Sequence, residues 1–216
     1  MIIAIDGPSG AGKSTVAKLL SKELGFEYID TGAMYRALAY KAYKNNIDIN
    51  KEEEISKMLE TTEVDYYDNK IFLDGENVEE LIRSEIISKA SSKISAIRIV
   101  REKMVELQRK IAANKNVVMD GRDIGTKVFP NADYKFFITA SLEERAKRRY
   151  EQLKSKGEAK YENILQDLKK RDENDSTRKF SPLIKAEDAI LIDTTDMSIE
   201  DVVKSLVNII GGNNVL

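Results

Sequence analysis

Nine consecutive residues near the start of the chain have types and a spacing suited to binding a phosphate chain. The first eight follow the pattern GxxxxGKS/T, and the nine are Gly7, Pro8, Ser9, Gly10, Ala11, Gly12, Lys13, Ser14 and Thr15. Glycine lets the backbone curl so that its N–H groups point at anionic oxygens, where a β-carbon would obstruct. Lys13 can reach the β- and γ-phosphates, and the Ser14 hydroxyl can ligate Mg²⁺. The pattern predicts a loop that binds a nucleoside triphosphate with Mg²⁺.

The composition limits the chemistry that the chain can perform. The 216 residues include no Cys and no His, which excludes disulfides, thiolate metal sites, thiol nucleophiles and imidazole bases. Any reaction therefore rests on Lys, Arg, Asp, Glu and hydroxyl groups. No apolar run approaches the roughly 18 residues that a membrane helix needs, and the phosphate loop begins at residue 7. We therefore expect no membrane span, no signal peptide and a cytoplasmic protein.

A strand before the loop and a helix after it must hold the loop in place. Residues 2–5 form an apolar run typical of a buried parallel strand, and residues 14–24 have the periodicity of a helix. The apolar positions of this helix are Val16, Leu19, Leu20 and Leu24. A second strand over residues 26–30 would complete a βαβ unit with a right-handed crossover.

The rest of the chain alternates between predicted strands and helices. Thr31 can cap a helix over residues 33–44, and Arg36 lies one turn inside that helix. Ser141 and Glu144 form a capping box that opens another helix. Further strands are predicted over residues 116–120, 134–139 and 189–192, and further helices over residues 51–60, 78–92, 97–114, 164–170 and 199–210, the last capped by Ser198.

An acidic segment between these helices has a different periodicity. From Asp48 to Glu85 there are 13 acidic and 4 basic residues. Within it, apolar and polar residues alternate, with turn dipeptides at residues 68–69 and 74–75. The apolar positions are Val64, Tyr66, Ile71, Leu73 and Val78. The segment predicts a small antiparallel meander inserted into an α/β fold.

Charged residues at the carboxyl end of the strand over residues 116–120 are the next candidates for chemistry. Ligands of open α/β sheets bind at this edge, and the sequence there is Asp120-Gly121-Arg122-Asp123. Asp120 is placed to support Mg²⁺, or else caps a neighbouring turn. Arg122 and Arg36 each follow a strand, and their guanidinium groups suit a phosphate on an acceptor molecule. The structural alternative is that both form ordinary ion pairs.

A basic region follows between residues 143 and 185, with 13 basic and 9 acidic residues. Interleaved acids argue against a nucleic-acid surface and favour a small polyanionic ligand. Two charged helices joined by a hydrophilic loop containing Gly157 predict a hinged lid. Its arginines could follow the transferred phosphoryl group, although we expect at least two to be surface charges. They are Arg145, Arg148, Arg149, Arg171 and Arg178.

The phosphate loop alone fits ATPases, GTPases and small-molecule kinases. The sequence contains no NKxD motif for reading guanine, which counts against a GTPase. A phosphate acceptor is mostly ionised at pH 7, since its second pKa is near 6, and so needs no imidazole base. A hydroxyl acceptor served by Asp123 stays possible on the residues alone.

Five motifs in this order and spacing resemble the bacterial cytidylate kinase family, also called CMP or dCMP kinases. They are IDGPSGAGKST, DTGAMYR, DGRDIGT, EERAKRR and KRDENDSTRKFSPL. The resemblance covers essentially the whole chain. It implies an α/β fold of the P-loop NTPase type, with a parallel five-stranded sheet, helices on both faces, a small antiparallel β insert and a helical lid. We expect one domain over residues 1–216, with its core in 1–30, 97–142 and 180–216, a monophosphate-binding region over about 31–96 and a lid over about 143–179.

The resemblance also implies the reaction and the roles of individual residues. The γ-phosphoryl group of Mg·ATP would pass to CMP or dCMP, with catalysis by positioning and charge. Lys13, Arg122 and Arg178 would be catalytic, and Arg148 would join the loop in binding ATP. The phosphate of CMP would bind Arg36 and Arg122, the base would lie near Thr31, Arg101, Asp123 and Arg178, and the sugar would face Ser92, Arg171 and Asp175.

The base assignment has a physical reason. Cytosine offers an N4 amino donor that a carboxylate such as Asp123 can accept, whereas uracil would put an oxygen there. The alternatives are a kinase for UMP or for a small hydroxylated metabolite, and a nucleotide-binding module without catalysis. We expect no nucleic-acid partner and a monomer.

Overall fold

A computed structural model of the protein describes residues 1–67, 70–154 and 159–212. The chain divides into two compact units. The first joins Met1–Tyr28 to Asn116–Leu216, and the second is Ile29–Lys115. The predicted turn at residues 68–69 and the loop around Gly157 lie outside the described residues.

The first unit contains the phosphate loop and the parallel sheet. Its strands and helices are β1 (Ile2–Asp6), α1 (Lys13–Leu24), β6 (Val117–Gly121), a π-helical turn (Ile124–Val128), β7 (Tyr134–Thr139), α6 (Leu142–Leu153), α7 (Tyr161–Thr177), β8 (Ile190–Asp193) and α8 (Ile199–Gly212). Strand β2 (Glu27–Asp30) lies at the boundary between the units. The strand order is β2-β6-β1-β7-β8, and β1 pairs in parallel with both β6 and β7. The predicted five-stranded parallel sheet is confirmed.

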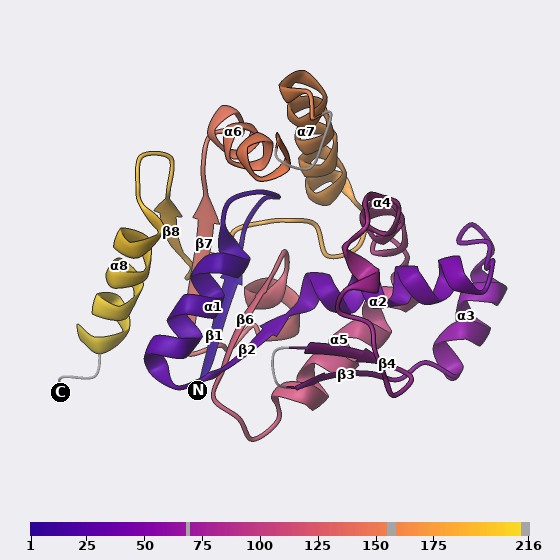
Figure 1. Cartoon of the computed structure of the whole chain (residues 1–216). Helices are drawn as coiled ribbons and strands as arrows, with labels where there is room; N and C mark the ends of the chain where they lie inside the picture. The colour runs from indigo at the N-terminus through magenta and orange to yellow at the C-terminus, as the bar shows by residue number, and fades with distance from the viewer. Residues whose placement is uncertain (68–69, 155–158, 213–216) are drawn as a thin grey trace. The chain divides into compact units, whose positions relative to one another are not determined.

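Both faces of this sheet carry apolar strand residues that are buried. Helices α1 and α8 pack together against one face (Figure 1), where Ile5, Leu20 and Leu206 belong to one core cluster. At alternate positions Ala4 and Met119 are also buried, so the strands have no solvent-facing side here. Strand β1 is held between two neighbours, which fixes its carboxyl end and the loop that follows it.

Two sequence expectations in the first unit need correction. Leu19 was expected on the apolar face of its helix, but its side chain is 40% exposed, because α1 buries a narrower stripe around Val16 and Leu20. Helix α7 is much longer than the predicted residues 164–170, since its polar composition hides a helix that packs on α6 along one side.

The second unit combines helices with a small antiparallel sheet. Its elements are α2 (Thr31–Lys44), α3 (Glu52–Glu60), β3 (Val64–Tyr67), β4 (Lys70–Leu73), β5 (Glu76–Asn77), a 3₁₀ turn (Leu81–Arg83), α4 (Glu85–Ile94) and α5 (Arg98–Ala112). Helix α2 contacts α4 and β4, and Leu38, Ile71 and Ile94 are fully buried. The strand order is β3-β4-β5, which confirms the predicted meander.

Turn and cap chemistry explains the remaining boundaries in this unit. Asp74 and Gly75 have positive φ values of 50° and 82°, as a hairpin turn of the primed type requires. The predicted helix over residues 78–92 is wrong in its first half. A 3₁₀ turn comes first, and α4 starts afresh at Ser84, whose Oγ accepts a hydrogen bond from Ile87 N at 3.3 Å.

The two units do not coincide with the regions expected from the sequence: residues 29–30 and 97–115, expected in the core, belong to the second unit, and the expected lid residues belong to the first. Helix α5 belongs to the second unit because it packs against α2, α3 and β3. The description of the chain as a single domain stays a prediction. Among the described residues, no helix is both long enough and apolar enough to cross a membrane.

Candidate active site

The phosphate loop is shaped by glycines that no other residue could replace without strain. Gly7 has φ 148°, and a β-carbon on it would lie 1.9 Å from the carbonyl oxygen of Ile138. Gly12 precedes α1 with φ 84°, and no side chain caps the first turn of that helix. The N–H groups at the start of α1 are therefore left without a side-chain acceptor, which is the arrangement that binds phosphate at a helix N-terminus.

Lys13 is buried beside this loop. Its Nζ donates a hydrogen bond to the carbonyl oxygen of Pro8 at 2.6 Å. Burial, followed by the nearby guanidinium of Arg122, lowers the pKa of Lys13 from 10.5 to about 7. The protein itself thus stabilises the charged form of Lys13 poorly. A bound polyphosphate would supply the negative charge that this ammonium group lacks.

Ser14 and Asp120 come together as expected, at the ends of neighbouring elements. The Ser14 hydroxyl donates to Asp120 Oδ2 at 2.8 Å, and the Tyr28 hydroxyl donates to Asp120 Oδ1 at 2.8 Å. Tyr28 was not expected at this site, although its place in a strand next to β6 could have suggested it. A hydroxyl and a carboxylate are the hard oxygen donors that Mg²⁺ prefers. Among the described residues, no group of three or more acidic side chains could hold a metal without help from a ligand.

Arg145 joins the lid helices to the phosphate loop, a role that the sequence did not reveal. Its Nη1 donates to the carbonyl oxygen of Ser9 at 2.9 Å and pairs with Asp172 Oδ2 at 2.5 Å, while Nε donates to Ala140 O at 3.0 Å. Asp172 Oδ1 in turn accepts a hydrogen bond from Ser9 N at 3.2 Å. Both backbone groups of Ser9 are therefore held by side chains from α6 and α7.

The other lid arginines have different environments. Arg149 is exposed, as a surface charge should be, and Arg148 contacts Glu144 Oε1 at 3.0 Å and the carbonyl oxygen of Thr194 at 2.6 Å. The side chains of Arg145 and Arg178 are only 8% and 6% exposed, so a solvated helix face does not explain these two arginines. Helical periodicity alone could not show that α7 packs beside Arg145, or that Arg178 at the end of α7 is buried.

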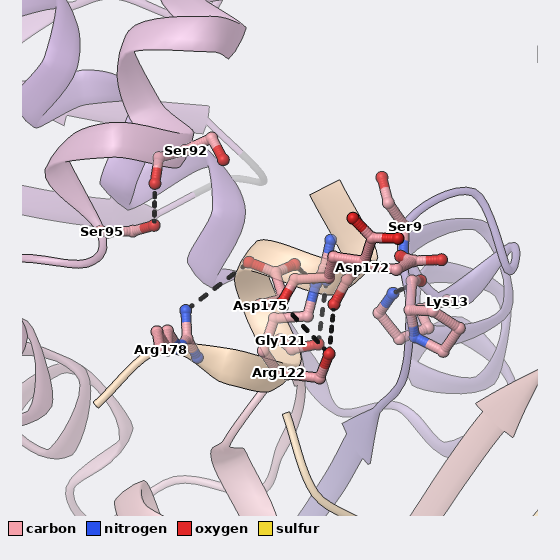
Figure 2. Close-up of polar contacts among 12 residues, drawn as sticks. Ser9, Lys13, Ser92, Ser95, Gly121, Arg122, Asp172, Asp175 and Arg178 are labelled. Atoms are coloured by element: carbon pink, nitrogen blue, oxygen red, sulfur yellow. Dashed lines mark hydrogen bonds and ion pairs between the residues drawn. The ribbon is translucent and has the colours of Figure 1, made fainter. Parts of the chain in front are cut away.

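A charged cluster forms around Arg122, at the carboxyl end of β6. Arg122 Nε pairs with Asp175 Oδ2 at 2.9 Å, and Arg178 Nη1 approaches Asp175 Oδ1 at 3.7 Å, as Figure 2 shows. Burial works against the charge of Asp175, but the guanidinium groups of Arg122, Arg171 and Arg178 outweigh it and hold the pKa of this carboxyl below its usual range. The structure thus brings together four of the residues that the sequence assigned to the acceptor.

Asp123 is buried at the start of the π-helical turn that follows this cluster. Its carbonyl oxygen accepts hydrogen bonds from Lys127 N at 2.8 Å and Val128 N at 3.1 Å. Asp6, at the end of β1, accepts hydrogen bonds from the two N–H groups that follow Asp123, those of Ile124 and Gly125. A buried acid here was not singled out from the sequence, because the residue before a phosphate loop looks like the end of a strand.

In the second unit, Arg36 is positioned by the residue that caps its helix. Asp30, and not Thr31 as expected, caps α2: Asp30 Oδ1 accepts from Ala33 N at 2.8 Å, and Oδ2 pairs with Arg36 Nη2 at 3.0 Å. The predicted cap was one residue late because β2 runs directly into α2. The Nε of Arg36 is buried and has no partner among the described residues, which leaves this guanidinium a donor for an anion.

Arg101 and Ser92 lie on neighbouring helices of the same unit. Arg101 is buried, donates from Nη1 to the carbonyl oxygen of Ser95 at 2.9 Å, and lies 5.4 Å from the ring centre of Tyr35. Ser92 accepts a hydrogen bond at its carbonyl oxygen from Ser95 Oγ at 3.1 Å (Figure 2). The guanidinium is thus held between α4 and an aromatic ring, which fixes its direction.

Comparison with known proteins now decides the family. The family described as cytidylate kinase matches residues 3–211 of the chain. A cytidylate kinase of Caldanaerobacter subterraneus subsp. tengcongensis is 58% identical over 212 residues, which cover 98% of this chain and 95% of that protein. The chain belongs to the cytidylate kinase family. A cytidylate kinase of Clostridioides difficile is 51% identical over 209 residues, covering 96% of this chain and 97% of the relative.

A solved structure supports the fold of this cytidylate kinase family member. The shikimate kinase from Acinetobacter baumannii, in complex with shikimate, aligns with a TM-score of 0.50 at 18% identity, covering 100% of this chain and 95% of the other. At this identity the likeness shows the fold alone. It agrees with the parallel sheet described above and confirms the predicted fold class.

Proposed function

We infer that the protein transfers the γ-phosphoryl group of ATP to CMP or dCMP. The observation that carries this conclusion is the position of Arg122. In the sheet, Asp6 of β1 pairs with Gly121 of β6, so the phosphate loop and Arg122 both begin one residue after paired strand ends. A donor loop and an acceptor arginine side by side are what phosphoryl transfer between two phosphates requires.

The donor would be bound as Mg·ATP. We propose that Ser14 Oγ ligates the ion and that Asp120 supports it from behind, because these two oxygens already lie 2.8 Å apart. The ion would neutralise charge on the β- and γ-phosphates. The start of α1 and the ammonium of Lys13 would bind the same phosphates, and Arg148 is proposed to contribute to ATP binding.

In the first unit we propose that Arg122 binds the phosphate of CMP and Asp123 accepts from its base. The sugar, the base and the transferred phosphoryl group would be oriented by Arg171, Asp175 and Arg178. The residues proposed as catalytic are Lys13, Arg122 and Arg178. Support comes from the buried cluster around Asp175, which holds Arg122 in one orientation. Cations fixed in advance stabilise the charge that spreads over the transferred group.

In the second unit we propose that Arg36 binds the CMP phosphate, supported by its buried Nε without a partner among the described residues. Thr31 and Arg101 are assigned to the base, and Ser92 to the sugar. Arg101 is supported by its fixed guanidinium above. These assignments are made for each unit by itself.

The reaction needs no general base on these residues. A phosphate oxygen of CMP, largely ionised at neutral pH, forms the new bond to the γ-phosphorus, and the bond from that phosphorus to the oxygen bridging to the β-phosphate breaks. ADP and CDP leave. The chain's part is to align the two phosphates and to balance their charge.

The test is ADP release measured across a panel of acceptors: CMP, dCMP, UMP and a small hydroxylated metabolite. We expect CMP and dCMP to stimulate release, and Arg122→Ala to lower kcat/KM for CMP roughly 100-fold or more while the protein stays folded. Arg149→Ala is the matched control, because Arg149 is exposed on α6, and its activity should stay near that of wild type.

Other outcomes would point elsewhere. UMP alone stimulating release would support a different monophosphate kinase. Steeply salt-dependent RNA binding without acceptor-stimulated ADP release would support a module without catalysis. A monomeric state, the absence of a nucleic-acid partner and a cytoplasmic location stay predictions, which size-exclusion chromatography with light scattering, RNA-binding measurements and cell fractionation would respectively check.

A further inference from the structure

Asp6 is a buried carboxylate that the proposed reaction does not use. It is the last residue of β1, directly before Gly7, and its side chain contacts a segment 118 residues away in sequence. Its Oδ1 accepts a hydrogen bond from Ile124 N at 2.8 Å, and its Oδ2 accepts one from Gly125 N at 2.7 Å. Each carboxylate oxygen is thus bonded to one backbone N–H of the turn that follows Asp123.

These two hydrogen bonds complete the π-helical turn. Within the turn, the carbonyl oxygen of Asp123 accepts from Lys127 and Val128, but the first N–H groups of any helical turn have no partner inside it. Asp6 supplies that partner from another strand. A β-carbon on Gly125 would lie 3.2 Å from Lys135 Cδ and 3.4 Å from Asp6 Oδ2, so the turn also packs closely against this carboxylate.

The charge of Asp6 is costly where it lies. Burial raises the pKa of Asp6 to about 6, with the neighbouring charge of Asp123 adding to the rise, while the two N–H bonds and the cation of Lys13 lower it. A single neutral acceptor at this position would avoid the burial cost but could not satisfy both N–H groups equally. The arrangement is therefore best explained by a need to hold both groups at once.

We propose that Asp6 is a positioning residue for base recognition. By fixing Ile124 N and Gly125 N, it sets the direction of the preceding residue, Asp123, so that the carboxylate of Asp123 accepts from the N4 amino group of cytosine. Because Asp6 is bonded to Gly7, one strand end positions the phosphate loop and the base-reading turn together. This inference rests on the proposed function, and in particular on Asp123 as the acceptor from the base.

The test is the ratio of kcat/KM for CMP to kcat/KM for UMP. Asp6→Asn keeps the shape of the side chain, but its amide –NH₂ faces a backbone N–H and cannot accept from it. We expect the ratio to fall roughly tenfold, because the turn no longer holds Asp123. Asp133→Asn is the matched control: Asp133 is exposed and accepts from Ile2 N at 2.6 Å at the other end of the same strand, and its ratio should not change.

A double-mutant cycle separates positioning from loss of stability. Asp123→Ala alone should lower the ratio, and adding Asp6→Asn to that background should lower it little further, because Asp6 acts through Asp123. A general loss of folding would lower kcat/KM for both acceptors and leave the ratio alone. If Asp6→Asn does not fold, Asp6→Ser serves instead, since it removes the buried charge and keeps one accepting oxygen.

The outcomes are distinct. A folded Asp6→Asn or Asp6→Ser variant with the wild-type ratio would overturn the inference, as would full additivity with Asp123→Ala. If the wild-type protein itself did not favour CMP over UMP, the proposed function would fail and not only the role of Asp6.

Discussion

Arg145→Met tests whether the lid helices hold the phosphate loop. The change removes the hydrogen bonds to the carbonyl oxygens of Ser9 and Ala140 and the ion pair with Asp172, and it keeps most of the apolar stem. Removing one partner of a buried ion pair costs about 3–5 kcal/mol. Asp172 is 22% exposed and can be partly solvated, so we expect the free energy of unfolding to fall by about 3 kcal/mol.

Urea denaturation followed by circular dichroism measures this loss. The midpoint should fall while the slope stays constant, because the surface exposed on unfolding is nearly unchanged. Arg149→Met is the matched control. It changes the same residue type on the same helix, but Arg149 is exposed and, among the described residues, donates a hydrogen bond only to Gln152 Oε1, at 3.5 Å. Its cost should therefore stay within about 0.5 kcal/mol.

The activity of the variant shows whether the contacts position the loop as well as stabilise the fold. Ser9 loses the group that holds its carbonyl, so the KM for ATP should rise roughly fivefold or more, with a smaller change in the KM for CMP. An Arg145→Met protein that unfolds within about 0.5 kcal/mol of wild type would refute the energetic reasoning. A destabilised variant with an unchanged KM for ATP would refute the positioning role.

Three further predictions concern the loop and the acceptor cluster. Gly7→Ala should cost at least about 3 kcal/mol by urea denaturation, whereas Gly12→Ala, whose β-carbon would meet nothing within 4 Å, should cost only about 1–2 kcal/mol for its positive φ. Lys13 has a pKa of about 7 in the free protein, against 10.5 for an ordinary lysine, so it is mostly neutral at pH 8, and binding of preformed Mg·ATP at that pH should take up a proton. The uptake should vanish below about pH 6, where Lys13 is already charged. Calorimetry in buffers of different ionisation enthalpy measures the uptake, and Lys13→Met should abolish it. Asp175→Asn should lower kcat/KM for CMP about tenfold, because Arg122 loses its charged partner, and steady-state kinetics should show little change in the KM for ATP.

Local sequence patterns predicted most of the fold because each pattern has a local physical cause. The glycines of the phosphate loop, the period of the meander and the caps at Ser141 and Ser198 all act within a few residues, and all match the structure. Some of the errors have a tertiary cause. Leu19 obeys helical spacing yet is exposed, because α1 is covered by neighbours over a narrower stripe than spacing alone suggests.

The candidate site could be predicted from the sequence only in part. Ser14 and Asp120 could be proposed from a motif and a strand end, and the structure brings them together. Arg122 could be proposed from its place after a strand, whereas Asp175 was assigned only through the family resemblance, and their ion pair was not predicted. Arg145 could not be assigned, since four basic residues share one helical run and only packing against α7 selects which is buried. The specific ligand roles of these residues stay predictions.

Helix α7 holds Asp172 on the phosphate loop and Asp175 on Arg122, three residues apart. An α-helix turns about 100° and rises about 1.5 Å per residue, so inserting or deleting one residue between these two acids would swing one of them to the far side of the helix. The number of residues between Asp172 and Asp175 therefore determines whether both acids can reach their partners at once. Substitutions at the exposed Glu173 and Asn174 should be tolerated, whereas an insertion or deletion between Asp172 and Asp175 should not. During evolution the length of this segment should therefore vary less than the identity of its residues.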